Sequence, residues 1–334
     1  MAGAPLRSGQ ERPWAGPIRL AWRRFRLELP RPLITARGCL DGKDGWLLRL
    51  ETPEGALGWG EAAPLEGNPE PLDRAIAALG SLRSRPELEQ WLARQTCPAS
   101  LAFALGAALA ELDGLPPQRW LPAPAGAVLL PAGEAALGAI DQLPPDVWRR
   151  PGLTLKWKVA AGEDARERRV LEQLLSRLPA TAQLRLDANG GWSRATAWAW
   201  AERLADEPRL QWLEQPLDPA DQAGLTALAL RLPVALDESL RHDPTQADRW
   251  PGWQVRRPSQ EGDPRPLLAA LQRGTPRMVL STAFETGIGR RWLEHLAALQ
   301  GQGPTPTAPG LAGDWQPGGG LASPDPEGVW EAAA

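Results

Sequence analysis

The chain has 334 residues, of which 43% are hydrophobic, and carries a formal net charge of −3. This length favours two domains, or one large α/β barrel with an addition. The small net charge and the scattered arginines give no reason to expect nucleic acid or another polyanion as a partner.

The sequence also gives no sign of membrane or secretory targeting. It lacks a run of about 18 apolar residues that could cross a bilayer, and residues 1–17 lack the apolar core of a signal peptide. Cys39 and Cys97 are too few for a disulfide framework and have no metal-ligand spacing. We therefore expect a cytoplasmic protein whose partner is a small molecule. The sequence leaves open whether the protein forms a homo-oligomer.

The first third of the chain is typical of strands followed by helices. The expected strands cover residues 18–29, 45–51 and 56–60, and the expected helices cover residues 71–82, 86–94 and 100–112. Ser100 is a plausible cap of the last helix. A proline-rich stretch at residues 116–124 then marks a boundary, so residues 1–120 are predicted to form an α+β domain.

Beyond this boundary, short apolar strands alternate with helical stretches, a pattern that indicates a parallel sheet. The expected strands are 127–130, 153–159, 183–188, 210–214, 234–237, 253–257 and 277–280, and the clearest helices are 165–178, 193–205, 222–231 and 290–300. An eighth strand is weakly indicated near residues 304–307. No glycine-rich nucleotide fingerprint follows the first strand, so the α/β pattern favours a TIM-like barrel of seven or eight (β/α) units over residues 121–310.

Three successive strands of the predicted barrel end in an acidic residue. Asp187, Glu214 and Asp237 are 27 and 23 residues apart, and each spacing is one βα unit. They would meet at the carboxyl face of the barrel, where three carboxylates need neutralisation. A hard divalent cation suits all-oxygen ligation, and Mg²⁺ is the expected ion. Alternatively, each acid caps the helix that follows. Glu238, next to Asp237, is expected to support the site without binding the ion.

Lysine is rare in this chain, which contains 34 arginines and only three lysines. Two of the three are Lys156 and Lys158, which share one face of an expected strand because side chains alternate along a strand. Arginine keeps its proton near neutral pH, whereas a buried lysine can lose its proton and act as a general base. The alternative is that both lysines are solvated charges on the surface.

Several motifs together resemble the enolase superfamily in its muconate-lactonizing subgroup, and within it the o-succinylbenzoate synthase family. The motifs are Leu155-Lys156-Trp157-Lys158, Leu186-Asp187-Ala188-Asn189, Glu214-Gln215-Pro216, Leu236-Asp237-Glu238-Ser239-Leu240 and the stretch from Ser281 to Gly289. Two further stretches, residues 31–38 and 58–65, are similar to the loops with which the family's capping domain closes the barrel. The resemblance implies that residues 1–120, completed by part of residues 311–334, form this capping domain.

The resemblance also implies a role for each matched residue. Asp187, Glu214 and Asp237 correspond to the Mg²⁺ ligands, and Asn189 to a residue that orients them. Lys158 corresponds to the base, and Lys156 to the neighbour whose charge helps to lower the pKa of that base. The loop that contains Ser281, Thr282 and Gly287 leads into a helix amino terminus, which could seat the succinyl carboxylate of the substrate.

One position departs from the family pattern. Where the family has a lysine at the end of the sixth barrel strand, this chain has Arg257. Arginine cannot readily act as the second base that racemisation requires, but it can supply a cation beside the substrate. The departure therefore favours dehydration over racemisation. Two alternatives are that Arg257 only reflects the arginine-rich composition, and that Arg256 is the inward-facing residue.

The resemblance thus implies a Mg²⁺-dependent carbon-oxygen lyase of menaquinone or phylloquinone biosynthesis. Its expected reaction is the syn-dehydration of 2-succinyl-6-hydroxy-2,4-cyclohexadiene-1-carboxylate to 2-succinylbenzoate. An alternative within the superfamily is a dipeptide epimerase or an N-acylamino acid racemase. A more remote alternative is a barrel scaffold without catalytic activity.

Overall fold

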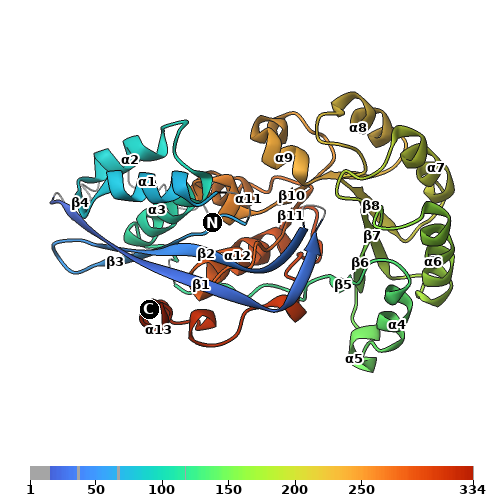
Figure 1. The fold of residues 1–334 in the computed structure, drawn as a ribbon, viewed down its shortest axis with the longest axis horizontal. Helices are drawn as coiled ribbons and strands as arrows, with labels where there is room; N and C mark the ends of the chain where they lie inside the picture. Colours follow the sequence, from blue (N-terminus) through green and yellow to red (C-terminus); the bar gives the residue numbers. More distant parts are fainter. Residues whose placement is uncertain (1–15, 36–37, 66–67, 117, 334) are drawn as a thin grey trace, which may run out of the picture.

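The computed structural model describes residues 16–35, 38–65, 68–116 and 118–333. Two sheets organise these residues, a four-stranded antiparallel sheet and a seven-stranded parallel sheet. Figure 1 shows them side by side, with the curved parallel sheet and its outer helices on one side of the molecule. Among the described residues, no helix combines the length and the apolar character needed to cross a membrane.

The antiparallel sheet has the strand order β3-β2-β1-β4 and is covered by helices from the same part of the chain. Its elements are β1 (Ile18–Thr35), β2 (Gly38–Glu51), β3 (Leu57–Ala62), β4 (Leu82–Arg83), α1 (Glu70–Leu79), α2 (Arg85–Leu92) and α3 (Ala99–Leu112). β2 and β3 form the predicted hairpin. α3 begins one residue earlier than expected, so Ser100 lies inside the helix, is buried and does not cap it.

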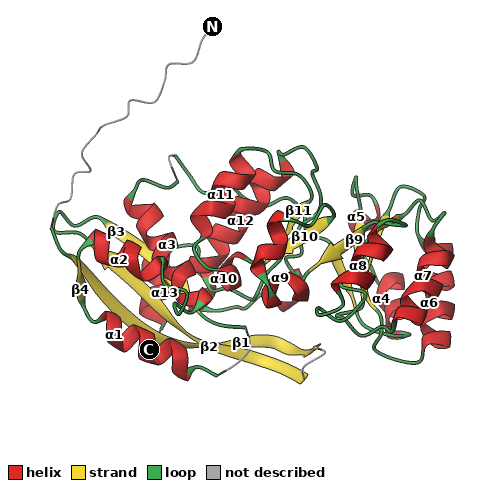
Figure 2. Ribbon diagram, turned by 90° about the horizontal axis from the view of Figure 1, so that it is seen from above, coloured by secondary structure: helices red, strands yellow, loops and turns green. Residues whose placement is uncertain are grey.

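Two glycines allow α3 to lie close on the antiparallel sheet. A Cβ atom at Gly58 or at Gly60 would come within 2.2 Å of a backbone carbonyl oxygen of α3. No side chain fits in that space. α3 is apolar on nearly all sides because it also contacts helices of the parallel sheet. Figure 2 shows α3 lying between the antiparallel sheet and these helices, α11 (Pro264–Gln272) and α12 (Gly287–Gly301).

The seven parallel strands follow one another around the sheet in chain order, which confirms the predicted barrel-type α/β fold. They are β5 (Val128–Leu130), β6 (Thr154–Lys158), β7 (Gln183–Asp187), β8 (Leu210–Glu214), β9 (Val234–Leu236), β10 (Trp253–Arg256) and β11 (Met278–Leu280). The connecting helices are α4 (Ala135–Asp141), α5 (Pro145–Trp148), α6 (Asp164–Arg177), α7 (Arg194–Leu204), α8 (Gln222–Ala229), α9 (Glu238–His242), α10 (Pro258–Glu261), α11 and α12.

The alternation along β6 shows how the sequence orients the strands. Leu155 and Trp157 are fully buried and belong to the apolar core between the strands and the outer helices. Lys156 and Lys158 occupy the alternate positions and therefore point to the inside of the curved sheet. The period of two thus separates the packing face of this strand from its charged face.

Two consecutive residues, Pro309 and Gly310, bridge the gap between the first and last strands in place of an eighth strand. The backbone N–H of Ala127, before β5, donates to the carbonyl of Pro309, and Gly310 forms a parallel bridge with Ser281 after β11. The eighth strand expected at residues 304–307 is therefore wrong in both place and length. Thr307 instead accepts a hydrogen bond from the buried guanidinium of Arg185 inside the barrel.

The sequence did not predict the last helix, α13 (Pro326–Ala332), because residues after Gly310 show no clear apolar period. α13 returns to the antiparallel sheet, where Trp330 packs edge to face on Trp59 of β3 with ring centroids 5.7 Å apart. Trp59 and Trp330 therefore belong to one apolar cluster with Phe284 and Ile288 of the parallel-sheet side.

A buried ion pair joins the antiparallel sheet to α12. Lys43 of β2 lies 3.0 Å from the Glu61 carboxylate of β3, and both side chains are at most 2% exposed. The other oxygen of Glu61 accepts hydrogen bonds from the backbone N–H and hydroxyl of Thr286, the N-cap residue of α12, and from the N–H of Gly289. One carboxylate therefore neutralises a buried lysine and accepts hydrogen bonds from the amino end of a helix.

We predict that Glu61→Ala lowers the free energy of unfolding by about 3–5 kcal/mol, because it leaves the buried ammonium of Lys43 unpaired. The measurement is a urea titration followed by tryptophan fluorescence. The control is Asp41→Ala, whose exposed carboxylate pairs with Arg26 and should change stability by about 0–1 kcal/mol. Equal effects of the two substitutions would contradict the prediction.

Candidate active site

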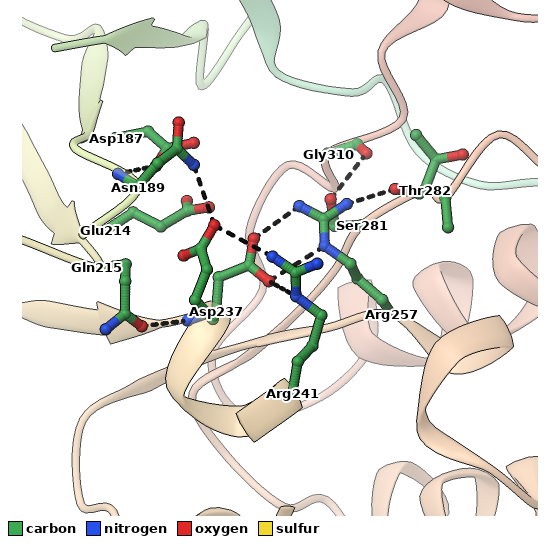
Figure 3. Close-up of polar contacts among 12 residues, drawn as sticks. Asp187, Asn189, Glu214, Gln215, Asp237, Arg241, Arg257, Ser281, Thr282 and Gly310 are labelled. Carbon is green, nitrogen blue, oxygen red and sulfur yellow. Dashed lines mark hydrogen bonds and ion pairs between the residues drawn. The ribbon is translucent and has the colours of Figure 1, made fainter. Parts of the chain in front are cut away.

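Four adjacent strands of the parallel sheet bring charged side chains to one place. In the sheet register, Lys158 of β6 lies beside Asp187 of β7, and Asp187 lies beside Glu214 of β8. Asp237 directly follows β9. The three carboxylates are each at most 2% exposed, and Figure 3 shows them grouped at the ends of their strands. The structure thus brings together the three acids that the sequence assigned to one site.

The amine of Lys156 neutralises two of these acids. Its Nζ atom lies 2.8 Å from Oδ2 of Asp187 and 2.6 Å from Oε1 of Glu214. Burial alone would lower the pKa of Lys156, but the charges of the two carboxylates outweigh burial and raise it. Lys156 therefore remains a cation and serves as a counter-ion.

Lys158 has the opposite environment, although it stands on the same face of the same strand. Among the residues that the structure describes, no carboxylate pairs with its amine. Burial lowers the pKa of Lys158, and the charges of Lys156 and Arg257 lower it further against the opposing effect of Asp187. Of the two lysines, Lys158 is therefore the one suited to lose its proton.

Arg257, and not Arg256, faces the site. Nε and Nη2 of Arg257 lie 3.1 and 2.7 Å from the two oxygens of Asp237, and Nη1 donates to the carbonyl of Thr282. Arg256 instead pairs with Glu261 of α10. Burial would raise the pKa of Asp237, but the charge and hydrogen bonds of Arg257 outweigh it and lower this pKa to about 2. Asp237 is therefore a carboxylate held by a two-pronged guanidinium.

Glu238, the residue after Asp237, links two further residues. Its Oε1 atom accepts hydrogen bonds from Asn189 at 3.2 Å and from Arg241 at 3.2 Å. Its Oε2 atom is buried and has no hydrogen-bond partner among the described residues. Burial, together with the charges of Asp237 and Asp187, raises the pKa of Glu238 to about 7. Asn189 therefore contacts Glu238 through its side chain and Asp187 through its own N–H.

Gln215 also shapes the site, although the sequence suggested no role for it. It is fully buried and has a φ of 36°, in the left-handed region. Its Oε1 atom accepts from the backbone N–H groups of Asp237 and Ser239, and its Nε2 atom donates to Leu217 and Ser239. Gln215 therefore ties the end of β8 to the end of β9. Its only sequence signal is its place directly after Glu214.

The chemistry of the donors suits a hard divalent ion, because the three predicted ligands are all carboxylates on neighbouring strand ends. The orphaned buried oxygen of Glu238 is a further acceptor that needs a positive partner. In the part of the chain that the structure describes, however, no three His, Cys, Asp or Glu side chains are grouped closely enough to form a ready-made metal cage. The acids are instead paired with Lys156 and Arg257.

The sequence predicted a carboxylate seat in the loop after β11 and at the start of α12, and part of this helix end is used within the protein. The N–H groups at this helix end already bind the carboxylate of Glu61. A Cβ atom at Gly287 would come 1.7 Å from the carbonyl oxygen of Ser323, so this glycine permits close packing of the C-terminal segment. Glu61 thus takes the N–H groups of Thr286 and Gly289 at this helix end, and the assignment of Gly287 to the substrate stays a prediction.

The other two residues assigned to the substrate lie at the end of β11. The Ser281 hydroxyl lies 3.4 Å from the carbonyl of Gly310 (Figure 3), and the Thr282 hydroxyl donates to Glu285 within the loop. The carbonyl of Thr282 binds Arg257. Both residues therefore border the charged site, but the bonds in this structure serve the loop itself.

One of the two predicted capping loops contacts the barrel directly. The N–H of Leu65 donates to Oε1 of Gln260 in α10 at 2.8 Å, and Nε2 of Gln260 donates to the carbonyl of Ala63 at 3.0 Å. In the other loop, residues 31–38, Ala36 and Arg37 lie outside the described residues. The stretch at residues 58–65 thus reaches the helix that follows Arg257.

Comparison with known proteins relates this architecture to one family. The family model described as "Enolase C-terminal domain-like" matches residues 149–250. The o-succinylbenzoate synthase of Thermosynechococcus vestitus is 37% identical over 293 residues, which cover 84% of this chain and 88% of that protein. The o-succinylbenzoate synthase of Edwardsiella ictaluri is 31% identical and covers 86% of this chain and 88% of its own length.

Solved structures agree with these sequence relatives. The o-succinylbenzoate synthase from Thermosynechococcus elongatus BP-1, complexed with Mg in the active site, has a TM-score of 0.78 and 35% identity over 94% of this chain and 99% of its own. The dipeptide epimerase from Methylococcus capsulatus has a TM-score of 0.71 at 20% identity, over 90% of this chain and 91% of its own, which supports the fold alone. On the strength of its close relatives, the chain belongs to the o-succinylbenzoate synthase family of the enolase superfamily.

Proposed function

We propose that the protein catalyses the dehydration of 2-succinyl-6-hydroxy-2,4-cyclohexadiene-1-carboxylate to 2-succinylbenzoate. The observation that carries this proposal is the unpaired amine of Lys158 in register with the buried carboxylates of Asp187 and Glu214. The reaction needs one base on one face of the substrate, and this site provides one amine free to act. Membership of the family supports the same choice.

In this mechanism Lys158 performs both proton transfers. Its neutral amine removes the proton next to the substrate's ring carboxylate, and the resulting ammonium returns a proton to the departing hydroxyl on the same face. The surroundings of Lys158 favour the neutral amine, because burial and the charges of Lys156 and Arg257 lower its pKa. Loss of water then produces an aromatic ring, which favours the second step.

Asp187, Glu214 and Asp237 would hold a Mg²⁺ ion, as the chemistry of these oxygen donors suits it. When bound, the ion supplies positive charge that stabilises the negative charge developing on the substrate carboxylate. In this structure Lys156 pairs with Asp187 and Glu214, and Arg257 pairs with Asp237. The related synthase from Thermosynechococcus elongatus carries Mg in its active site, which supports the assignment.

The bonds of Arg257 argue against the alternative of an epimerase or racemase. Those reactions need a second base on the opposite face of the substrate, and Arg257 is bound to both oxygens of Asp237. A guanidinium in such a pair keeps its proton, and the charge of Asp237 outweighs burial and raises the pKa of Arg257. A scaffold without activity would have no use for an unpaired, half-buried amine beside three buried acids.

We also propose that residues 1–120, completed by part of residues 311–334, act as a capping domain over the barrel of residues 121–310. The contact between Trp330 and Trp59 supports the completion by the C-terminal segment. The bonds between Gln260 and residues 63–65 support the closing role of that loop. A small carboxylate substrate would then lie between this loop and the strand ends.

We predict that Lys158→Ala lowers the rate of succinylbenzoate formation by about 10²–10⁴-fold or more, because it removes the proposed base. The rate is measured by the ultraviolet absorbance of the aromatic product. Lys158→Arg is the matched variant, since it keeps a cation but not a base, and it should be equally inactive. Near-normal turnover in either variant would refute the role of Lys158.

We predict that Mg²⁺ binding to the substrate-free protein is detectable by titration calorimetry and is lost in Asp187→Asn, which removes one charged ligand oxygen. Asp243→Asn is the control, because Asp243 caps a short helical turn outside the site and should leave the binding heat unchanged. Binding that persists in Asp187→Asn would show that the ion is held elsewhere.

We predict no exchange of the α-proton with solvent when the protein is incubated with an L,L-dipeptide in deuterium oxide, because Arg257, proposed for the second face, keeps its proton and cannot act as a base. Mass spectrometry and chiral chromatography measure deuterium uptake and stereochemistry. Deuterium uptake with loss of stereochemistry would instead identify the protein as an epimerase.

A further inference from the structure

The backbone turns sharply directly after Lys158. Val159 still belongs to the sheet edge, since its N–H donates to the carbonyl of Asp187 at 2.9 Å. The next residue, Ala160, has a φ of 58°, in the left-handed region that favours glycine. A non-glycine residue persists in this conformation only where its surroundings hold it there.

The side chain of Glu167 supplies that support. Glu167 comes from the first turn of α6 and is only 2% exposed. Its Oε2 atom accepts from the N–H of Ala160 at 2.8 Å, and its Oε1 atom accepts from the N–H groups of Ala161 and Gly162 at 2.9 and 3.0 Å. Within the described ranges no lysine or arginine pairs with Glu167, so these three backbone groups are its hydrogen-bond partners.

The same turn is held from the opposite side by the loop that follows Asp187. A Cβ atom at Gly191 would come 2.9 Å from the Cβ atom of Ala160, so the two loops touch and leave no room for a larger side chain. The residues after Lys158 are therefore clamped between Glu167 and a loop that begins at a predicted metal ligand.

We propose that Glu167 is a positioning residue for Lys158, an inference that rests on the proposed function of Lys158 as the base. The amine of Lys158 has no ionic partner among the described residues, in contrast to Lys156 with its two carboxylates. Its location is therefore set by the backbone at the end of β6. Three hydrogen bonds to a charged, buried acceptor hold that backbone in one conformation. The competing explanation is that Glu167 only stabilises the start of α6.

The test compares Glu167→Gln with Asp164→Asn in the intact protein. Both substitutions change an acid to its amide in the first turn of α6, but Asp164 bonds Trp200 and Arg168 and does not touch the turn after Lys158. The amide of Glu167→Gln has only one acceptor oxygen, so it cannot accept all three N–H groups. We expect kcat to fall by about 10- to 100-fold in Glu167→Gln, with KM and the Mg²⁺ Kd within about threefold of the wild type. Asp164→Asn should keep its kcat even where it loses thermal stability.

A second readout does not depend on activity. The chain has only three lysines, and Lys43 and Lys156 are both buried in ion pairs. Acetylation by acetic anhydride, mapped by mass spectrometry, therefore reports on Lys158. We expect the labelling rate of Lys158 to rise roughly threefold or more in Glu167→Gln, because a loosened strand end exposes the amine, and to stay unchanged in Asp164→Asn.

Each outcome decides the proposal. Equal kcat in the two variants, with equal labelling of Lys158, would overturn it and leave Glu167 a structural residue.

Where Glu167→Gln does not fold, Gly191→Ala replaces it, since the added methyl group presses on Ala160 from the other side while Glu167 stays intact. The same fall in kcat is then expected, and wild-type kinetics would overturn the proposal. Absence of succinylbenzoate formation by the wild type would refute the proposed function, and the labelling comparison would still decide whether Glu167 positions Lys158.

Discussion

The neutralisation of buried carboxylates at the ends of three neighbouring strands is the constraint on which the site depends. Asp187, Glu214, Asp237 and Glu238 are all carried there by the register of the parallel sheet. Isolated charges at this depth would be costly, because the surroundings cannot solvate them as water does. Lys156, Arg241 and Arg257 meet this cost with direct ion pairs. The pairs therefore hold a charged cluster together inside an apolar barrel, without necessarily adding stability of their own.

This arrangement separates two lysines that the sequence places side by side. Lys156 forms ion pairs with two carboxylates, whereas the amine of Lys158 has no ionic partner among the described residues. The difference arises because Lys156 lies deeper in the sheet, within reach of both neighbouring acids, and Lys158 stands at the rim. The three-residue clamp formed by Glu167 acts on the backbone at that rim. A lysine whose amine is free of ion pairs depends on such backbone support for its position.

Polar contacts attach the antiparallel sheet to the edge of the barrel that carries the charged site. Glu61 binds Lys43 and the amino end of α12, and α12 begins just after the loop that holds Arg257 through Thr282. Gln260 adds a second link from α10 to residues 63–65. Contacts of the antiparallel sheet thus reach the elements that follow β10 and β11. This explains why a carboxylate from the first third of the chain occupies a helix terminus in the last third.

The sequence by itself determined the features that depend on local periodicity and spacing. The apolar alternation located all seven barrel strands to within two residues at either end, because the two faces of each strand meet different surroundings. The even spacing of Asp187, Glu214 and Asp237 predicted one shared site, since successive parallel strands end at the same edge. Only the tertiary structure decided that Arg257 faces Asp237, that Glu61 fills the start of α12 and that Gly310 bridges the gap in the barrel. These contacts join residues up to about 230 positions apart, and no pattern within a single strand or helix carries information about such distant partners.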